Sequence, residues 1–143
     1  AYNLRSCSYL DDFLKQKLVY TPVNSEYRFA LVPSNIYFPN SLFMITGENI
    51  EFLCGIFNSK LYRFFLYIMF SNGKYTYGSS SFFLSMPVIK NVDNISLNRI
   101  VQLVKKLSNE YDEKLYENLN EEIYKIYDIS IEEINYIENI IKN

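Results

Sequence analysis

The sequence contains no histidine and no tryptophan among its 143 residues. Without histidine, Ser-His and Cys-His nucleophilic systems, the zinc deaminase signature and most hydrolytic zinc sites are excluded. A metal site made of carboxylates alone remains open. The adjacent pair Asp11 and Asp12 is a poor candidate for one, because neighbouring side chains on a helix do not point the same way. We expect this pair to lie on a solvated surface or at the start of a helix.

Cysteine and glycine are scarce as well. Cys7 and Cys54 are far apart and form no Cys-x-x-Cys spacing, so neither a zinc site nor a disulfide scaffold is indicated. Cys54 lies in an apolar stretch and is expected to be a small core residue. Only four glycines occur, and the sequence has no glycine-rich phosphate loop, no Asn-Pro-Pro-Tyr and no nuclease-type carboxylate–lysine pattern. We expect no catalysis, cofactor or metal in this fragment.

Long hydrophobic runs and targeting signals are also missing. The largest apolar run, residues 64–70, is far shorter than the roughly 20 residues that span a bilayer, so it predicts a buried helix and no membrane contact. No signal-peptide pattern is present, and unpaired cysteines favour a reduced, cytoplasmic setting. Because the chain begins with Ala1 rather than Met, we expect it to be a piece of a longer protein.

What the sequence does contain is hydrophobic residues at 49%, enough for a core, and an uneven distribution of charge. Residues 1–90 hold eight basic and five acidic residues, a net charge of +3, whereas residues 91–143 hold six basic and eleven acidic residues, a net charge of −5. If the chain has a nucleic-acid surface, the charge therefore places it in the first part.

The first part has the pattern of mixed structure. Short β-like runs at 18–23, 29–32, 42–46 and 82–89 are separated by Pro, Asn and Ser clusters. Between the third and fourth runs, residues 49–70 have helical periodicity, with Asn49 as a candidate N-cap. Asn58 and Ser59 interrupt this stretch and can cap a second helix, and residues 71–73 end it.

The second part is predicted to be helical. Apolar residues recur at three- and four-residue steps from Leu97 to Leu115, which predicts an amphipathic helix beginning near Ser96 and passing through Tyr111. Residues 118–120 have the composition of a break, and Ser130 with Glu133 has capping-box spacing for a last helix. We therefore expect an α+β fold, in which a small mixed or antiparallel sheet carries an inserted helical pair and is followed by a C-terminal helical segment. The predicted units are an α+β part at 1–92 and an acidic helical tail at 93–143 packed on it, with one continuous domain as the alternative.

Four phrases occur in a fixed order along the chain. They are KLVY at 17–20 leading into RFAL at 28–31, LCGIFNSKL at 53–61, LSMPVI at 84–89, and IYKIYDISIEEI at 123–134. Together they resemble the TaqI-like C-terminal specificity domain of type II restriction-modification enzymes, over residues 14 to 143. Asp128 departs from the pattern, since the family more often has Gly after this Tyr, but Asp tolerates a left-handed backbone.

The resemblance implies a domain that selects a DNA sequence for another part of a larger enzyme. In this family the domain is attached to an N6-adenine methyltransferase, often with a fused nuclease, and clasps double-stranded DNA opposite the methyltransferase. S-adenosylmethionine, and Mg²⁺ where a nuclease is present, are expected in the parent enzyme and not in this fragment. The expected partners are double-stranded DNA and the methyltransferase or nuclease domains of the parent chain, with no membrane.

Reading DNA requires cations for phosphates, and amides or forked donors for base edges, on loops that can enter a groove. Residues 24–28 and 71–81 have this composition, and they fall between the phrases of the family. Lys60 and Arg63 lie three residues apart on one helix face, from which both could approach a phosphate backbone. The alternatives are solvated loops without a partner and surface cations whose stems pack on apolar surface. The predicted DNA-binding residues are Asn24, Ser25, Arg28, Lys60, Arg63, Asn72, Lys74, Tyr75, Tyr77, Ser79 and Ser80.

Two other functions remain open. The exposed faces of a helix over 96–115 suit pairing with a like helix, as in the helical spacers of type I specificity subunits, which makes a protein–protein interaction module the main alternative. A metal-dependent nuclease using Asp11, Asp12 and Glu26 is the third.

Overall fold

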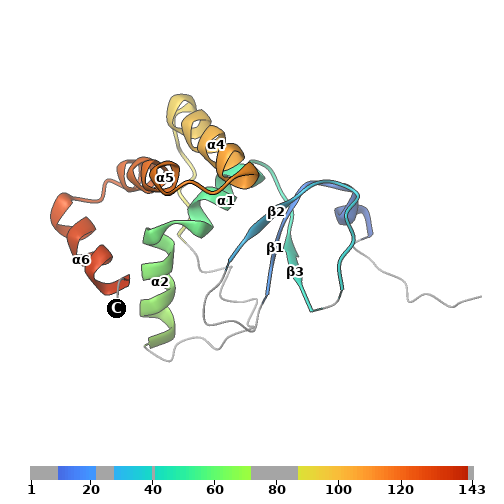
Figure 1. Ribbon diagram of the computed structural model, residues 1–143, viewed down its shortest axis with the longest axis horizontal. Helices are drawn as coiled ribbons and strands as arrows, with labels where there is room; N and C mark the ends of the chain where they lie inside the picture. The colour runs from blue at the N-terminus through green and yellow to red at the C-terminus, as the bar shows by residue number, and fades with distance from the viewer. Residues whose placement is uncertain (1–9, 22–27, 40, 72–86, 142–143) are drawn as a thin grey trace, which may run out of the picture.

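The computed structural model describes residues 10–21, 28–39, 41–71 and 87–141. A three-stranded antiparallel sheet lies at one side of the molecule and the helices lie at the other (Figure 1). The described elements are the 3₁₀ turn η1 (Leu10–Leu14), β1 (Lys17–Tyr20), β2 (Ala30–Val32), β3 (Phe43–Ile45), α1 (Ile50–Asn58), α2 (Lys60–Ser71), α4 (Asn94–Asn109), α5 (Glu113–Ile126) and α6 (Ile131–Ile141). The predicted α+β fold is confirmed.

The sheet has the order β2-β1-β3, with β1 in the centre. Leu18 lies opposite Leu31 of β2 and Ile45 of β3, and all four residues of β1 are buried. The first three predicted strands are therefore present: β1 begins one residue before its predicted run and ends earlier, β2 begins one residue later, and β3 is one residue shorter at each end. The fourth prediction, 82–89, lies partly outside the described residues, and the described residues 87–89 are not in a strand.

The predicted division of the central helical stretch is confirmed. α1 ends at Asn58 and α2 begins at Lys60, and the Ser59 hydroxyl between them donates to Ile56 O (2.7 Å) and accepts from Tyr62 N (3.2 Å). Ser59 thus serves the ends of both helices. Asn49 stands at the N-cap of α1 in a left-handed conformation (φ 52°), but its side chain makes no capping hydrogen bond. Asn49 is therefore the N-cap residue, as predicted, but by its left-handed backbone and not by a side-chain hydrogen bond.

The helical tail differs from the prediction in where it breaks. α4 begins at Asn94, capped by the Asp93 carboxylate, and ends at Asn109 before Tyr111. The Asp112 carboxylate accepts from Leu115 N (2.8 Å) and starts α5, so the chain breaks at 110–112. The predicted break at 118–120 lies inside α5, where Asn120 is buried and hydrogen-bonded. Polar composition there reflects a tertiary contact and not a turn.

The start of the last helix follows the prediction. Ser130 Oγ accepts from Glu133 N (3.3 Å) while the Glu133 carboxylate accepts from Ser130 N (2.8 Å), which is a capping box. Before it, Ile129 N donates to Tyr124 O and Asp128 N donates to Lys125 O, the two bonds of a Schellman motif. Asp128 takes the left-handed position of this motif, at φ 53°.

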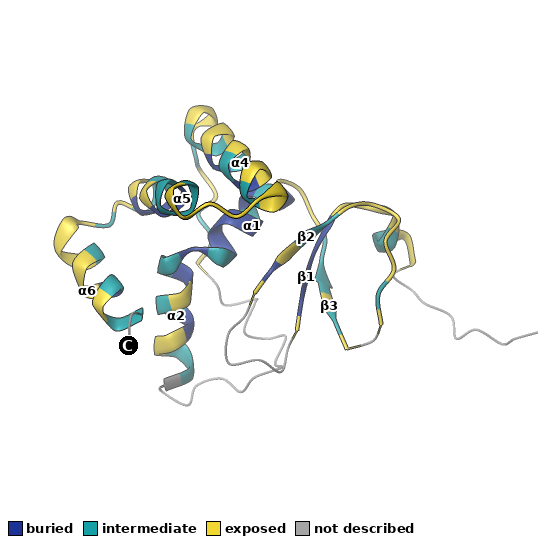
Figure 2. Ribbon diagram, in the orientation of Figure 1, coloured by how far each residue is buried: buried dark blue, intermediate teal, exposed yellow. Residues whose placement is uncertain are grey.

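One buried cluster runs through both parts of the chain. It joins Leu18 and Phe29 of the first part to Ile100 and Ile123 of the helical tail. The buried faces of the helices point inward along this cluster, as Figure 2 shows in dark blue. α1 approaches α4 closely at Gly55, where a Cβ atom would stand 3.0 Å from methyl groups of Ile100 and Val104. The tail therefore completes the core that α1 begins.

α2 contains the apolar run at 64–70, and it is only partly buried. Leu66 is buried, whereas Tyr67 and Ile68 are exposed. No helix in the described part of the chain is long and apolar enough to cross a membrane.

Candidate nucleic-acid interface and its scaffold

Three of the predicted DNA-binding residues are described in the structure: Arg28, Lys60 and Arg63. The other eight lie outside the described residues, namely Asn24, Ser25, Asn72, Lys74, Tyr75, Tyr77, Ser79 and Ser80. Their attachment points are described, however. The ends of β1 and β2 that flank residues 22–27 and the C-terminal end of α2 face the same side of the molecule (Figure 1). The two predicted segments thus begin from one side.

Arg28 is exposed and immediately precedes the buried Phe29. The Asn58 side chain fixes the Phe29 backbone by accepting from Phe29 N (3.1 Å) and donating to Phe29 O (2.8 Å). The Asn58 amide also donates to Cys54 O (3.0 Å). The Asn58 side chain thus makes the two backbone hydrogen bonds of Phe29 that a neighbouring strand would otherwise make. These bonds fix the residue that precedes β2.

Aromatic packing connects this point to α2. Phe29 packs against Tyr20, Phe57 and Tyr62, with ring centroids 5.3, 5.0 and 6.1 Å away. Arg63 follows Tyr62 on α2 and is exposed. Arg28 and Arg63 are thus the chain neighbours of two rings that contact each other. This contact joins two chain segments that carry predicted cations, from positions 35 residues apart in the sequence.

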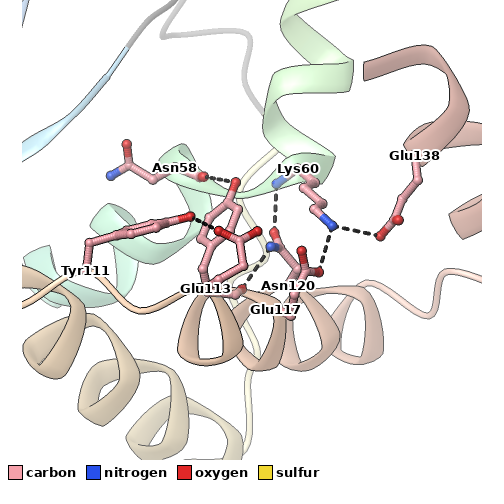
Figure 3. A network of polar contacts seen from close by, with 8 residues as sticks. Asn58, Lys60, Tyr111, Glu113, Glu117, Asn120 and Glu138 are labelled. Atoms are coloured by element: carbon pink, nitrogen blue, oxygen red, sulfur yellow. Dashed lines mark hydrogen bonds and ion pairs between the residues drawn. The ribbon is translucent and has the colours of Figure 1, made fainter. Parts of the chain in front are cut away.

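Lys60, in contrast, is directed into the protein. Its Nζ lies 2.6 Å from a Glu117 carboxylate oxygen of α5 and 3.1 Å from a Glu138 oxygen of α6, and only 13% of its side chain is exposed (Figure 3). Partial burial alone would lower the pKa of Lys60, but hydrogen bonds to the two carboxylates outweigh it and the pKa is raised. Lys60 is therefore committed to holding α5 and α6 on α2. We therefore no longer expect Lys60 to bind DNA.

The same junction fixes the start of α2. Asn120 Oδ1 accepts from Lys60 N (2.8 Å), and its amide donates to Tyr116 O (2.9 Å) (Figure 3). The buried amide of α5 thereby satisfies one of the free N–H groups at the beginning of α2. Tyr116 Oη donates to Asn58 O (3.1 Å), which links α5 to the end of α1 as well.

A second cation of the first part is also used internally. Lys17 is fully buried, and its ammonium donates to the main-chain oxygens of Pro33 (3.1 Å) and Ile36 (3.4 Å). The Phe13 ring lies 6.0 Å from the same ammonium. Lys17 therefore contributes to the net charge of the first part without lying at its surface.

The four sequence phrases contact one another in pairs. Asn58 of the second phrase binds Phe29 of the first. Tyr127 of the fourth phrase donates its hydroxyl to Pro87 O (3.0 Å) and accepts from Ile89 N (3.3 Å), both in the third phrase. The described residues of the phrases thus act as a scaffold, and the predicted recognition segments lie between them in the sequence. Sequence analysis missed these scaffold roles of Asn58, Asn120 and Tyr127.

The described residues offer little for the nuclease alternative. Asp12 binds Lys15 Nζ (2.8 Å) and Thr46 Oγ1 (3.2 Å), and Glu26 lies outside the described residues. In the described ranges, no group of three or more metal-binding side chains occurs. Cys54 is buried, as predicted, and desolvation raises the pKa of its thiol to about 11, so it is not a thiolate nucleophile at neutral pH.

No family model matches the sequence, and no curated protein or solved structure matches it.

Proposed function

We propose that this chain is a sequence-specific DNA target-recognition domain of a restriction-modification enzyme and has no catalytic activity of its own. The observation that carries the proposal is the pairing of the four phrases on which the resemblance to TaqI-like specificity domains rests. Phrases that are far apart in the sequence bind each other through Asn58 and Tyr127. Such contacts are expected where a scaffold is kept and the segments between its parts differ from one recognition domain to the next.

The placement of charge also favours this function. The segments that carry Arg28 and Lys74 begin on the same side of the molecule. Arg28 precedes Phe29 and the exposed Arg63 follows Tyr62, and the rings of Phe29 and Tyr62 contact each other. Cations of this kind suit phosphates, and the amide and hydroxyl groups of residues 24–25 and 71–81 suit base edges. The acidic helices would repel phosphate and are proposed to face away from the DNA.

The proposal includes the setting of the domain. The parent chain would be a cytoplasmic, bacterial-type N6-adenine methyltransferase, possessing a nuclease in some members, and it would hold the S-adenosylmethionine and any Mg²⁺. The DNA sequence upstream of the codon for Ala1 is expected to encode an Asn-Pro-Pro-Tyr or Asn-Pro-Pro-Phe motif.

The interaction-module alternative gains no support from the described helices. The predicted 96–115 helix ends at Asn109, and its apolar residues Ile100 and Val104 are buried against α1. The exposed positions of α4 beyond Ile95 are polar or charged. A helix of this composition is less suited to pairing with another copy.

The first prediction tests DNA recognition directly. We expect selection from a random duplex library with this chain to enrich one short sequence. On that duplex, Arg28→Ala and Lys74→Ala should each weaken binding and reduce the slope of log K against log salt by about 0.9. Fluorescence anisotropy at several salt concentrations measures both quantities.

Lys105→Ala, at an exposed position of α4, is the matched control and should leave the slope unchanged. Failure to enrich any sequence, or unchanged slopes for both Arg28→Ala and Lys74→Ala, would contradict the proposed function.

A further inference from the structure

A cavity of about 450 Å³ is lined by residues of α5, α6 and the turn between them. It exists because α6 leaves the Asp128 turn and packs on α2 instead of lying along α5 (Figure 1). Its size falls within the range of roughly 300–1,000 Å³ that is usual for ligand sites. The hydrogen-bonded network around Lys60 forms part of its wall, through Glu117, Asn120 and Glu138.

The chemistry of the lining is acidic and apolar together. The carboxylates of Glu117, Glu121 and Glu138 line the cavity, and Ile129, Ile131 and Ile134 supply its apolar side. Lys125 also lines the cavity, and its ammonium pairs with Glu122 (2.9 Å). Glu117 and Glu138 share the single ammonium of Lys60. Glu121 is exposed and has no ion pair among the described residues. A carboxylate is thus available at the mouth of the cavity, next to exposed apolar surface such as Ile131, which is 78% exposed.

A second observation indicates that the cavity binds a ligand. Tyr124 lines the cavity and is only 3% exposed, and its hydroxyl is buried without a hydrogen-bond partner in the part of the chain that the structure describes. Buried hydroxyl groups nearly always have a partner. The hydroxyl has almost no accessible surface, so a ligand that carries N–H donors would bond to the Tyr124 oxygen only after the side chains over it move aside. The same ligand could bond to the surrounding carboxylates directly, whereas an anionic ligand would be repelled.

We propose that this cavity is a docking site for a basic protein segment, in which a lysine or arginine side chain binds the carboxylates and Tyr124 and an adjacent apolar residue packs on the isoleucines. Charge complementarity supports this occupant, since residues 91–143 carry a net charge of −5. The isoleucines favour a peptide over a simple cation, because a polar ion alone would leave their surface uncovered.

The proposal is tested by methyl NMR of the isoleucine-labelled 143-residue chain, with N-acetyl-Leu-Arg-amide as the probe. We expect saturable shifts of the Ile131 and Ile134 methyl signals that N-acetyl-Leu-Gln-amide does not produce. Glu121→Gln should lower the association constant about two- to fivefold, as expected for a partly exposed ion pair. Tyr124→Phe should weaken binding while leaving the apolar lining intact.

Glu132→Gln, an exposed carboxylate of α6 that does not line the cavity, is the matched control and should bind the probe as the wild type does. Equal shifts from both dipeptides, no shift at Ile131 and Ile134, or equal weakening by Glu132→Gln would overturn the proposal. Binding of n-butylammonium chloride as tightly as the arginine peptide would also overturn it, because it would indicate a small amine and not a protein segment. None of these outcomes depends on DNA binding.

Discussion

At the scale of single residues, the structure depends on amides and hydroxyls that join segments far apart in the sequence. Asn58 is the best example, because its one side chain serves both the N–H and the C=O of Phe29. A residue with both a donor and an acceptor is required for this pairing, which aspartate and leucine cannot provide. Asn58 thereby determines where the strand next to Arg28 begins.

We expect Asn58→Ala to lower the free energy of unfolding by about 1–3 kcal/mol, because the buried polar groups of Phe29 lose their partners. Urea denaturation followed by circular dichroism measures the change. Asn98→Ala, at an exposed position of α4, should change the stability by less than about 0.5 kcal/mol. Equal effects of the two substitutions would show that Asn58 does not have the role described.

Tyr124 gives a prediction of pH dependence. Burial, and then the charges of Glu138 and Glu117, raise the pKa of Tyr124 above the value of about 10 for an unfolded tyrosine. The folded chain therefore keeps this proton at a pH at which the unfolded chain loses it. The resulting contribution to stability is complete below about pH 10 and is lost as the pH rises further.

We therefore expect the free energy of unfolding to fall above about pH 10, and to fall less steeply in Tyr124→Phe. Below pH 9, Tyr124→Phe should be neutral or slightly more stable, because the hydroxyl that it removes has no partner among the described residues. Urea titrations between pH 7 and 11 measure both effects, with Tyr67→Phe at an exposed position as the control. An unchanged slope in Tyr124→Phe would contradict the explanation.

At the scale of elements, the ends of helices are determined mainly by local chemistry. Asp93, Asp112 and Ser130 start α4, α5 and α6 with side-chain hydrogen bonds to the first turn. The end of α5 is a Schellman turn whose left-handed position is held by Asp128 at φ 53°. This conformation costs an L-residue more than it costs glycine.

Asp128→Gly is accordingly expected to raise the free energy of unfolding by about 0.5–1 kcal/mol, since relief of the left-handed strain outweighs the larger entropy of an unfolded glycine. A glycine introduced into a helix interior should instead lower the free energy of unfolding. Lys105→Gly, in the exposed middle of α4, should lower the stability by about 1 kcal/mol. Thermal and urea unfolding distinguish the two signs, and a loss of stability in Asp128→Gly would disprove the assignment of the turn.

At the scale of the whole molecule, the sheet, the central helices and the helical tail share one buried cluster. Residues of the tail that contact this cluster are Ile100, Val104, Leu119 and Ile123. Burial of each such side chain contributes about 1.5–3 kcal/mol, so the four together are comparable to the total stability of about 5–15 kcal/mol of a typical domain. We therefore expect the boundary at residue 92 to separate two regions of charge and not two independently folding units.

We expect a chain truncated after residue 92 to lose its cooperative unfolding transition and its near-ultraviolet circular dichroism, because α1 would expose its face at Gly55. The full chain should unfold in a single transition. A truncated chain that unfolds with the midpoint of the full chain would show instead that residues 1–92 fold independently.

The sequence by itself determined the features that depend on neighbouring residues. Apolar periodicity and capping residues predicted the helices, the break at Asn58 and Ser59, the capping box at Ser130 and Glu133, and the first three strands, because these signals act within one or two turns of the chain. The prediction of a helix break at residues 118–120 was wrong. The polar side chain of Asn120 instead accepts a hydrogen bond from the first residue of α2, which a local pattern cannot indicate. Sequence analysis also placed Lys60 on the surface beside Arg63, because two cations with the same local pattern cannot be told apart without their surroundings.

Only the tertiary structure decided which of these residues are available for binding. Folding brought Glu117 and Glu138 to Lys60 from positions 57 and 78 residues away and left Arg63 exposed. It also opened the cavity between α5 and α6 and buried the Tyr124 hydroxyl beside it. The physical reason is that a charge or a hydroxyl acquires its role from the groups that burial places around it, and chain folding, not sequence separation, determines those groups.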